Sequence, residues 1–191
     1  MSSATNEAII AATQTWLERA VIGLNLCPFA KAVHVKKQIR YVVSRAITEE
    51  ELLSDLMNEL EFLAETPSEK IDTTLLIHPA VLTDFLDYND FLDVVDAALE
   101  DMELEGILQV ASFHPQYQFA DTQPDDIENF TNRSPYPTLH LLRESSMVLA
   151  VSAYPEADKI FDKNIGTLRK LGRAGWDELG LVKVNPPAEN K

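Results

Sequence analysis

The amino-acid sequence predicts an α/β fold: a single domain with a small, mainly parallel sheet of three or four strands around a βαβαβ core, packed with an N-terminal helix and C-terminal helices. Two observations support this prediction. Short apolar segments at 39–44, 73–77 and 107–113 alternate with longer amphipathic stretches at 48–63 and 83–102, which can connect parallel strands by right-handed crossovers. Two of the apolar segments also end in the same dipeptide, His-Pro.

The segment before the first strand is predicted to be one amphipathic helix. Between residues 5 and 22 its larger apolar side chains recur at intervals of three and four, and Gly23 follows as a suitable end. Residues 39–44, Ile-Arg-Tyr-Val-Val-Ser, are mostly β-branched or aromatic, which is typical of a strand.

The two amphipathic stretches are predicted to be helices that each place one apolar face on the sheet. Thr48 and Glu51 have the spacing of a capping box, in which both side chains bond backbone N–H groups at the helix start. The inward residues are Leu52, Leu53, Leu56, Leu60 and Leu63 in the first helix and Phe85, Tyr88, Phe91, Leu92, Val95, Leu99 and Met102 in the second. Gly106 then separates the second helix from the third strand.

After the third strand and a long loop, the chain is predicted to become helical again. Pro137 suits a first helical position, with Leu139 and Leu142 facing inward. On that helix, His140 and Glu144 are four residues apart and are expected to form a surface pair.

Two further helices and a tail complete the expected domain. A short apolar helix is predicted to end at Tyr154, and a last helix is predicted to run from Pro155 to a cap at Gly172. The inward residues of the last helix are expected to be Ile160, Phe161, Ile165, Leu168 and Leu171. We expect one domain over residues 1–181 and a disordered tail over 182–191.

The acidic charge of the chain is concentrated in its middle. The net charge is −15 for 191 residues, and residues 48–105 carry 18 of the 31 acidic side chains against one base, Lys70. The acids fit the solvated faces of the two central helices. An acidic surface repels phosphates, so nucleic-acid binding is not expected, whereas the near-neutral remainder can still bind a small anion.

Cysteine content and hydropathy predict a cytoplasmic protein. Cys27 is the one cysteine and cannot form an internal disulfide, which fits a reducing compartment. Residues 1–15 lack a basic start followed by an apolar segment, and no apolar run approaches the roughly 20 residues that span a bilayer. We therefore expect neither a secretory signal nor a membrane partner.

His78 and His114 are the first candidates for a catalytic pair. Each follows a predicted strand directly and precedes a proline. Parallel strands end at the same edge of a sheet, where ligands bind in open α/β folds, and a histidine can act there as general acid or base. The alternative is that each ring bonds backbone groups and only ends its strand.

The loop from 115 to 137 is long for a compact domain, which favours an active or binding loop; the alternative is a structural cover for the sheet edge. Its aromatic residues, Tyr117 among them, and its prolines are expected to order it. Candidate contacts for an anionic substrate are Arg133, Asn132, Asn129, Arg143, Arg45 and Tyr117. The asparagines and arginines can equally satisfy the loop's own backbone and acids.

Cofactor motifs are sparse. Six scattered glycines form no phosphate-binding loop, so no nucleotide is expected. A metal, if present, would use His78, His114, Asp125 and Asp126, although no established ligand spacing occurs.

Cys27 is a third candidate for catalysis. Lys31 and His34 lie close in sequence and would lower the pKa of its thiol. The Cys-Pro-Phe-Ala motif, however, follows a helix rather than a strand and lacks a resolving cysteine, so a buried structural cysteine is the alternative.

Several segments resemble a known family. They are NLCPFA at 25–30, RYVVS at 40–44, His78-Pro79 with DFLDYNDFL at 84–92, and the long loop. They are similar to an uncharacterised bacterial family, domain of unknown function 1415, over roughly residues 5–172. The resemblance implies a soluble, single-domain bacterial protein and supplies no activity, cofactor or catalytic residue.

These residues predict a small-molecule enzyme of the hydrolase or lyase type. Its site would lie at the carboxyl edge of the sheet, lined by Ser44, Arg45 and the 115–137 loop, with His114 as general acid or base, His78 as its partner and Arg133 holding an anionic substrate. One alternative is a non-catalytic module that binds a metabolite or a protein. The other is thiol-dependent activity at Cys27.

Overall fold

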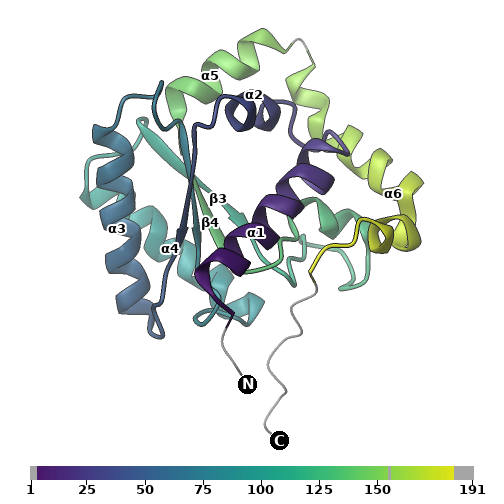
Figure 1. Ribbon diagram of the computed structural model, residues 1–191, viewed down its shortest axis with the longest axis horizontal. Helices are drawn as coiled ribbons and strands as arrows, with labels where there is room; N and C mark the ends of the chain where they lie inside the picture. The colour runs from purple at the N-terminus through teal and green to yellow at the C-terminus, as the bar shows by residue number, and fades with distance from the viewer. Residues whose placement is uncertain (1–3, 155, 183–191) are drawn as a thin grey trace, which may run out of the picture.

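A computed structural model describes residues 4–154 and 156–182 (Figure 1). The helices and strands, in chain order, are α1 (Asn6–Trp16), the π-helical η1 (Leu17–Ile22), α2 (Ala30–Val35), β1 (Ile39–Val43), α3 (Glu49–Glu65), β2 (Thr73–Ile77), α4 (Phe85–Asp101), β3 (Leu108–Phe113), the 3₁₀ segment η2 (Ile127–Asn132), β4 (Thr138–Arg143), α5 (Glu144–Ala153), the 3₁₀ segment η3 (Ala157–Lys159) and α6 (Ile160–Glu178). The predicted helix start at Pro155 and residues 183–191 of the predicted tail lie outside the described residues.

The four strands form one mixed sheet in the order β1-β2-β4-β3. β1 and β2 are parallel, and β4 is antiparallel to both of its neighbours, β2 and β3. The prediction of a mainly parallel sheet is therefore wrong in this detail, although β1, β2 and β3 do share one direction. The cause is β4, which inserts between β2 and β3 and which the sequence pattern predicts to be a helix.

β4 is a strand because its residues alternate between the two sides of the sheet. Leu139 and Leu141 are fully buried against the helices on one face, whereas Thr138, His140 and Leu142 point to the other. Its backbone pairs with strands on both edges, which a helix in the same place could not do. The expected surface pair of His140 and Glu144 does not form, since Glu144 begins α5.

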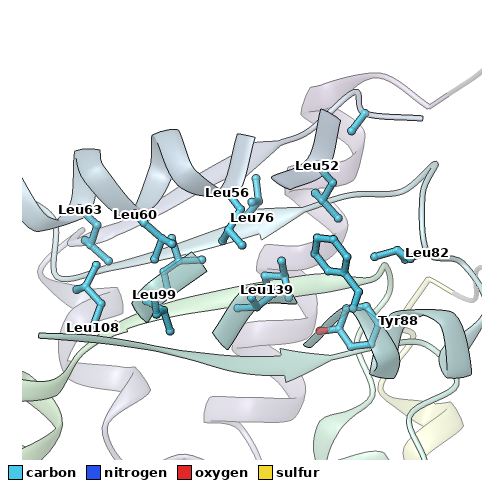
Figure 2. Packing of buried hydrophobic residues seen from close by; sticks show 14 of the residues in the cluster. Leu52, Leu56, Leu60, Leu63, Leu76, Leu82, Tyr88, Leu99, Leu108 and Leu139 are labelled. Carbon is cyan, nitrogen blue, oxygen red and sulfur yellow. The ribbon is translucent and has the colours of Figure 1, made fainter. Parts of the chain in front are cut away.

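α3 and α4 cover one face of the sheet and form the larger hydrophobic core. Figure 2 shows Leu52, Leu56, Leu60 and Leu63 of α3 above the sheet residues Leu76, Leu108 and Leu139. The predicted cap is present, because Thr48 Oγ1 accepts a hydrogen bond from the Glu51 N–H at 3.2 Å. From α4, the Tyr88 hydroxyl donates to the Thr138 carbonyl at 2.9 Å and accepts from the Phe113 N–H at 3.1 Å, which ties this helix to β4 and β3.

The opposite face of the sheet is covered by α1 and η1, with α2 and α5 at the top of the view in Figure 1. The second hydrophobic cluster lies here and includes Trp16, Leu17, Val21, Phe130, Leu168 and Trp176. The predicted N-terminal helix is present, with its second part π-helical and Gly23 as its C-cap.

The last helix is longer than expected. Gly172 does not end α6; it adopts a φ of 65°, which favours glycine, and the helix continues beyond this kink to Glu178. Phe161, expected to face inward, is 54% exposed, and its ring contacts Phe119 edge-on at 5.8 Å. Within residues 4–154 and 156–182, no helix has the length and hydrophobicity needed to cross a bilayer.

Candidate functional site

His78 and His114 lie at the same edge of the sheet, close to one another. The Tyr88 ring stacks on His78 at 5.7 Å between centroids and lies 5.1 Å from His114. Both histidines have no exposed surface. The two histidines share this edge because β2 and β3 run in the same direction. They are buried because α4 and the turn that contains Val81 and Leu82 cover them.

The ring nitrogens of these histidines are bonded mainly to backbone groups. His78 Nδ1 lies 3.0 Å from the Val81 carbonyl, and His114 Nε2 lies 3.2 Å from the Leu82 carbonyl. His114 Nδ1 accepts from the Gln116 N–H at 3.0 Å, and among the described residues His78 Nε2 has no partner. Burial lowers the pKa of each to about 4, so both are neutral at pH 7. They hold the turns after β2 and β3 in place, and their catalytic role stays a prediction.

The candidate binding residues of the 115–137 loop satisfy the loop itself. Asn129 is fully buried, accepts from the Phe119 N–H at 2.9 Å and donates to the Gln123 carbonyl at 2.8 Å. Asn132 donates to the Ser112 carbonyl at 3.2 Å, and the Tyr117 ring packs on Phe85 at 5.1 Å. These contacts order the loop.

Arg133 is also engaged with the loop. Its Nε donates to the Tyr117 carbonyl at 3.2 Å, its Nη2 donates to the Pro124 carbonyl, and its guanidinium lies 4.3 Å above the Phe130 ring. It lines a hollow of about 230 Å³ together with Arg173. Anion binding by Arg133 stays a prediction.

Of the remaining predicted residues, Ser44 lies at the same end of the strands as His78, because its N–H donates to the Ile77 carbonyl at 2.8 Å, whereas Arg45 and Arg143 have other partners. Arg45 is exposed and bonds Asn6 and the Ala4 carbonyl, and Ser44 donates to the Asp55 carboxylate at 2.6 Å. Arg143 lies at the opposite end of the strands from the histidines, because β4 runs antiparallel to β2 and β3. The expected grouping of Arg143 with Arg133 does not form, because residues 138–143 are a strand and not the helix that the sequence pattern predicts.

The described residues contain no group of three or more histidine, cysteine, aspartate or glutamate side chains placed to hold a metal. Asp126 Oδ2 accepts from the Gln123 N–H at 2.7 Å, and the histidines face backbone groups. The geometry therefore offers no support for a metal on His78, His114, Asp125 and Asp126.

A cavity of about 680 Å³ lies on the other face of the sheet, between the strands and the helices α1, η1, α2 and α5. Most of its lining is apolar. From the sheet it includes Ile39, Leu75, Ala111, Phe113 and Leu142, and from the helical side Trp16, Leu17, Val21, Phe29, Val33, Met147, Ala150, Ala153 and Tyr154. The rings of Phe29 and Tyr154 meet edge-on at 6.1 Å between α2 and α5.

His140 is a polar side chain in this apolar wall. Its Nε2 lies 2.7 Å from Thr73 Oγ1, and that hydroxyl contacts the Leu141 carbonyl at 2.6 Å. Burial lowers the pKa of His140 to about 4, so the ring is neutral at pH 7. The sequence prediction misses this residue because it places His140 on a helix surface; the alternation of Leu139 and Leu141 is the signal that could have revealed it.

Comparison with known proteins identifies the family but no activity. The family described as a protein of unknown function (DUF1415) matches residues 8–178. The chain belongs to the DUF1415 family. Searches of curated proteins and of solved structures gave no match.

In this DUF1415 protein, Cys27 lines the same cavity. Burial raises the pKa of its thiol, and the N–H groups of Phe29 and Ala30 only partly offset that effect. A raised pKa favours the thiol over the reactive thiolate at pH 7. The geometry therefore favours the structural interpretation of Cys27, as part of an apolar wall.

Charged side chains of the DUF1415 cavity gather where β1 and β2 begin. The lining there includes Lys36, Glu69, Asp72 and Arg143, whose formal charges cancel. Asp72 accepts a hydrogen bond from Ser146 at 2.6 Å, which fixes the start of α5, and lies 3.9 Å from Arg143. The cavity thus has an apolar body and one polar end without a net positive charge.

Proposed function

We propose that this protein binds a small, mainly apolar molecule in the cavity between the sheet and the helices α1, η1, α2 and α5. The observation that carries the proposal is the size and lining of the hollow. Its volume of about 680 Å³ falls in the range of roughly 300–1,000 Å³ that is usual for small-molecule sites. Atoms that line an empty apolar hollow lack contacts on one side, and a ligand supplies these contacts.

Binding is favoured over the predicted hydrolase or lyase activity at the sheet's carboxyl edge. That activity depends on ring nitrogens of His78 and His114, three of which contact backbone groups while the fourth, His78 Nε2, is buried, and neither side chain has exposed surface. The large cavity, in contrast, presents both apolar surface and a polar side chain, His140. A metabolite-binding module therefore fits the arrangement best.

The fluorescent probe N-phenyl-1-naphthylamine, which is neutral and largely apolar, tests the proposal. We expect saturable binding to one site, and Ala111→Phe should weaken it at least tenfold because the new ring fills the cavity beside His140. Ala150→Phe fills the cavity from α5, on the opposite side, and should weaken probe binding by a similar factor.

The matched control is Ala97→Phe, at an exposed position of α4, which should bind the probe as the wild type does. Circular dichroism and thermal melts establish that each variant is folded. Absence of saturable binding to the wild type, or full affinity in a folded Ala111→Phe variant, would contradict the proposal.

α5 is the wall of the cavity that should respond to the ligand. None of its ten residues is buried, although Met147, Ala150 and Ala153 line the cavity. Segments with few buried contacts open easily, so added contacts slow their opening. We expect saturating probe to slow amide hydrogen exchange in α5 at least tenfold, measured by mass spectrometry. Exchange in α3, whose leucines are already packed in the core, should stay the same. If α5 exchange is unchanged while the probe is bound, α5 does not form a wall of the binding site.

A further inference from the structure

We infer that the ligand of this cavity is a neutral, apolar molecule that carries a hydroxyl group and donates it to Nδ1 of His140. The inference rests on the proposed function and names its ligand class: apolar alcohols and phenols, in preference to carboxylates and to hydrocarbons without a donor. It is carried by the hydrogen bonds around His140 and by the charges of the cavity lining.

The bonds of Thr73 determine which nitrogen of His140 holds the proton. A hydroxyl has one hydrogen, and a carbonyl can only accept, so Thr73 donates to the Leu141 carbonyl at 2.6 Å. At 2.7 Å from the same oxygen, His140 Nε2 must then be the donor. In a neutral ring the other nitrogen, Nδ1, is an acceptor.

His140 Nδ1 is an acceptor without a partner within the described part of the chain. The only hydrogen bond found there for the His140 side chain is the one to Thr73. Its cross-strand neighbours, Leu75 and Ala111, are apolar, and the Phe113 ring lies 6.0 Å away. An acceptor that loses water to a bound apolar molecule is left unsatisfied, whereas a ligand hydroxyl restores the bond.

The charges of the lining argue against an acidic ligand. A carboxylate offers no proton to Nδ1, and burial opposes the protonation of His140 that would make it a donor. The two cations of the lining, Lys36 and Arg143, are balanced by Glu69 and Asp72. Arg143 is moreover occupied by backbone carbonyl groups. A neutral donor is therefore the matching chemistry.

Three ligands with the same ring system separate these classes: 2-naphthol, its methyl ether 2-methoxynaphthalene, and 2-naphthoate. At pH 7, calorimetric titration of the wild type should show 2-naphthol binding at least fivefold more tightly than the ether and the carboxylate. In His140→Phe, naphthol and ether should bind equally, while His34→Phe, which changes a histidine outside the cavity lining, should keep the wild-type preference.

A spectroscopic measurement supports the test if His140→Phe folds poorly. Two-bond ¹⁵N correlation spectra of the wild type should show a neutral His140 protonated at Nε2, with the Nδ1 resonance shifting when 2-naphthol binds. Equal affinity for naphthol and ether in the wild type, or tightest binding of naphthoate, overturns the inference but leaves the cavity as a binding site. If neither these ligands nor N-phenyl-1-naphthylamine bind, the proposed function fails as well.

Discussion

Acidification from pH 7 to pH 4 is expected to unfold this protein, because the buried His78 and His114 and the half-buried His140 must stay neutral for the fold to persist. Burial lowers the pKa of His78, His114 and His140 to about 4, against 6.5 for an ordinary histidine. For each group that difference corresponds to at most about 3.5 kcal/mol. The three together are comparable to the roughly 5–15 kcal/mol by which a typical domain is stable.

The direction of the effect follows from proton linkage. Between pH 4 and 6.5 the unfolded chain binds more protons at these histidines than the folded chain does, so the free energy of unfolding falls as pH falls. The stabilising contribution of the three neutral histidines is complete above about pH 6.5 and is lost progressively as the pH falls toward 4. Around His114, the charge of Asp84 raises its pKa and that of Arg133 lowers it, but burial is the largest influence.

Urea unfolding at pH 7.0, 6.0, 5.5 and 5.0 measures this dependence. The slope of the free energy of unfolding against pH should steepen as pH falls and approach uptake of three protons near pH 5, and His140→Phe should reduce it by about one third. A free energy of unfolding that is flat from pH 7 to 5 would show that the three rings are not held neutral.

Much of the fold can be predicted from the sequence because the signals are local. The β-branched run at β1 and the capping pair Thr48 and Glu51 lie within single segments, and each indicates its own structure. The shared edge of His78 and His114 also follows from local patterns, since each directly ends a strand. These features need no knowledge of distant contacts.

β4 could not be assigned in this way. Over six residues, Leu139 and Leu142 fit a helical interval while Leu139 and Leu141 fit the alternation of a strand. The choice is made by β2 and β3, which offer backbone partners on both sides. The direction of the His140 side chain depends on that choice, and so does the cavity.

The candidate site was harder to predict than the fold, because residue type does not reveal which partner a side chain finds. Arg133 and Asn129 are suitable contacts for an anion, yet both are engaged with the loop backbone. The cavity needs wall residues from α1, α2, α5 and all four strands. Only the folded arrangement brings these together.

Replacing Arg143 with methionine is expected to destabilise the protein far more than the loss of an exposed charged side chain. Its Nη2 contacts three carbonyl groups: Leu63 at 2.5 Å, Ile71 at 3.1 Å, and Thr66. These carbonyls belong to the end of α3 and the approach to β2, where a cation also opposes the negative end of the helix dipole. The side chain is only 10% exposed, so water cannot easily replace it.

Loss of the guanidinium leaves buried carbonyl groups unsatisfied and removes the cation 3.9 Å from Asp72. We expect Arg143→Met to lower the free energy of unfolding by about 2–4 kcal/mol, measured in urea at pH 7. Arg143→Lys should recover part of this loss, since an ammonium keeps the charge but not the planar fork.

Arg45→Met is the matched control, because Arg45 is exposed and its loss should change stability by less than about 0.5 kcal/mol. The same variants distinguish the predicted ligand contact from the structural role. If Arg143 holds the ligand, a stable Arg143→Met protein with weakened probe binding is expected. If Arg143 instead joins α3 to β2 and β4, Arg143→Met lowers the free energy of unfolding and weakens probe binding as a consequence. Arg143→Lys then recovers stability and binding together. Full stability in Arg143→Met would mean that these carbonyl groups find other donors.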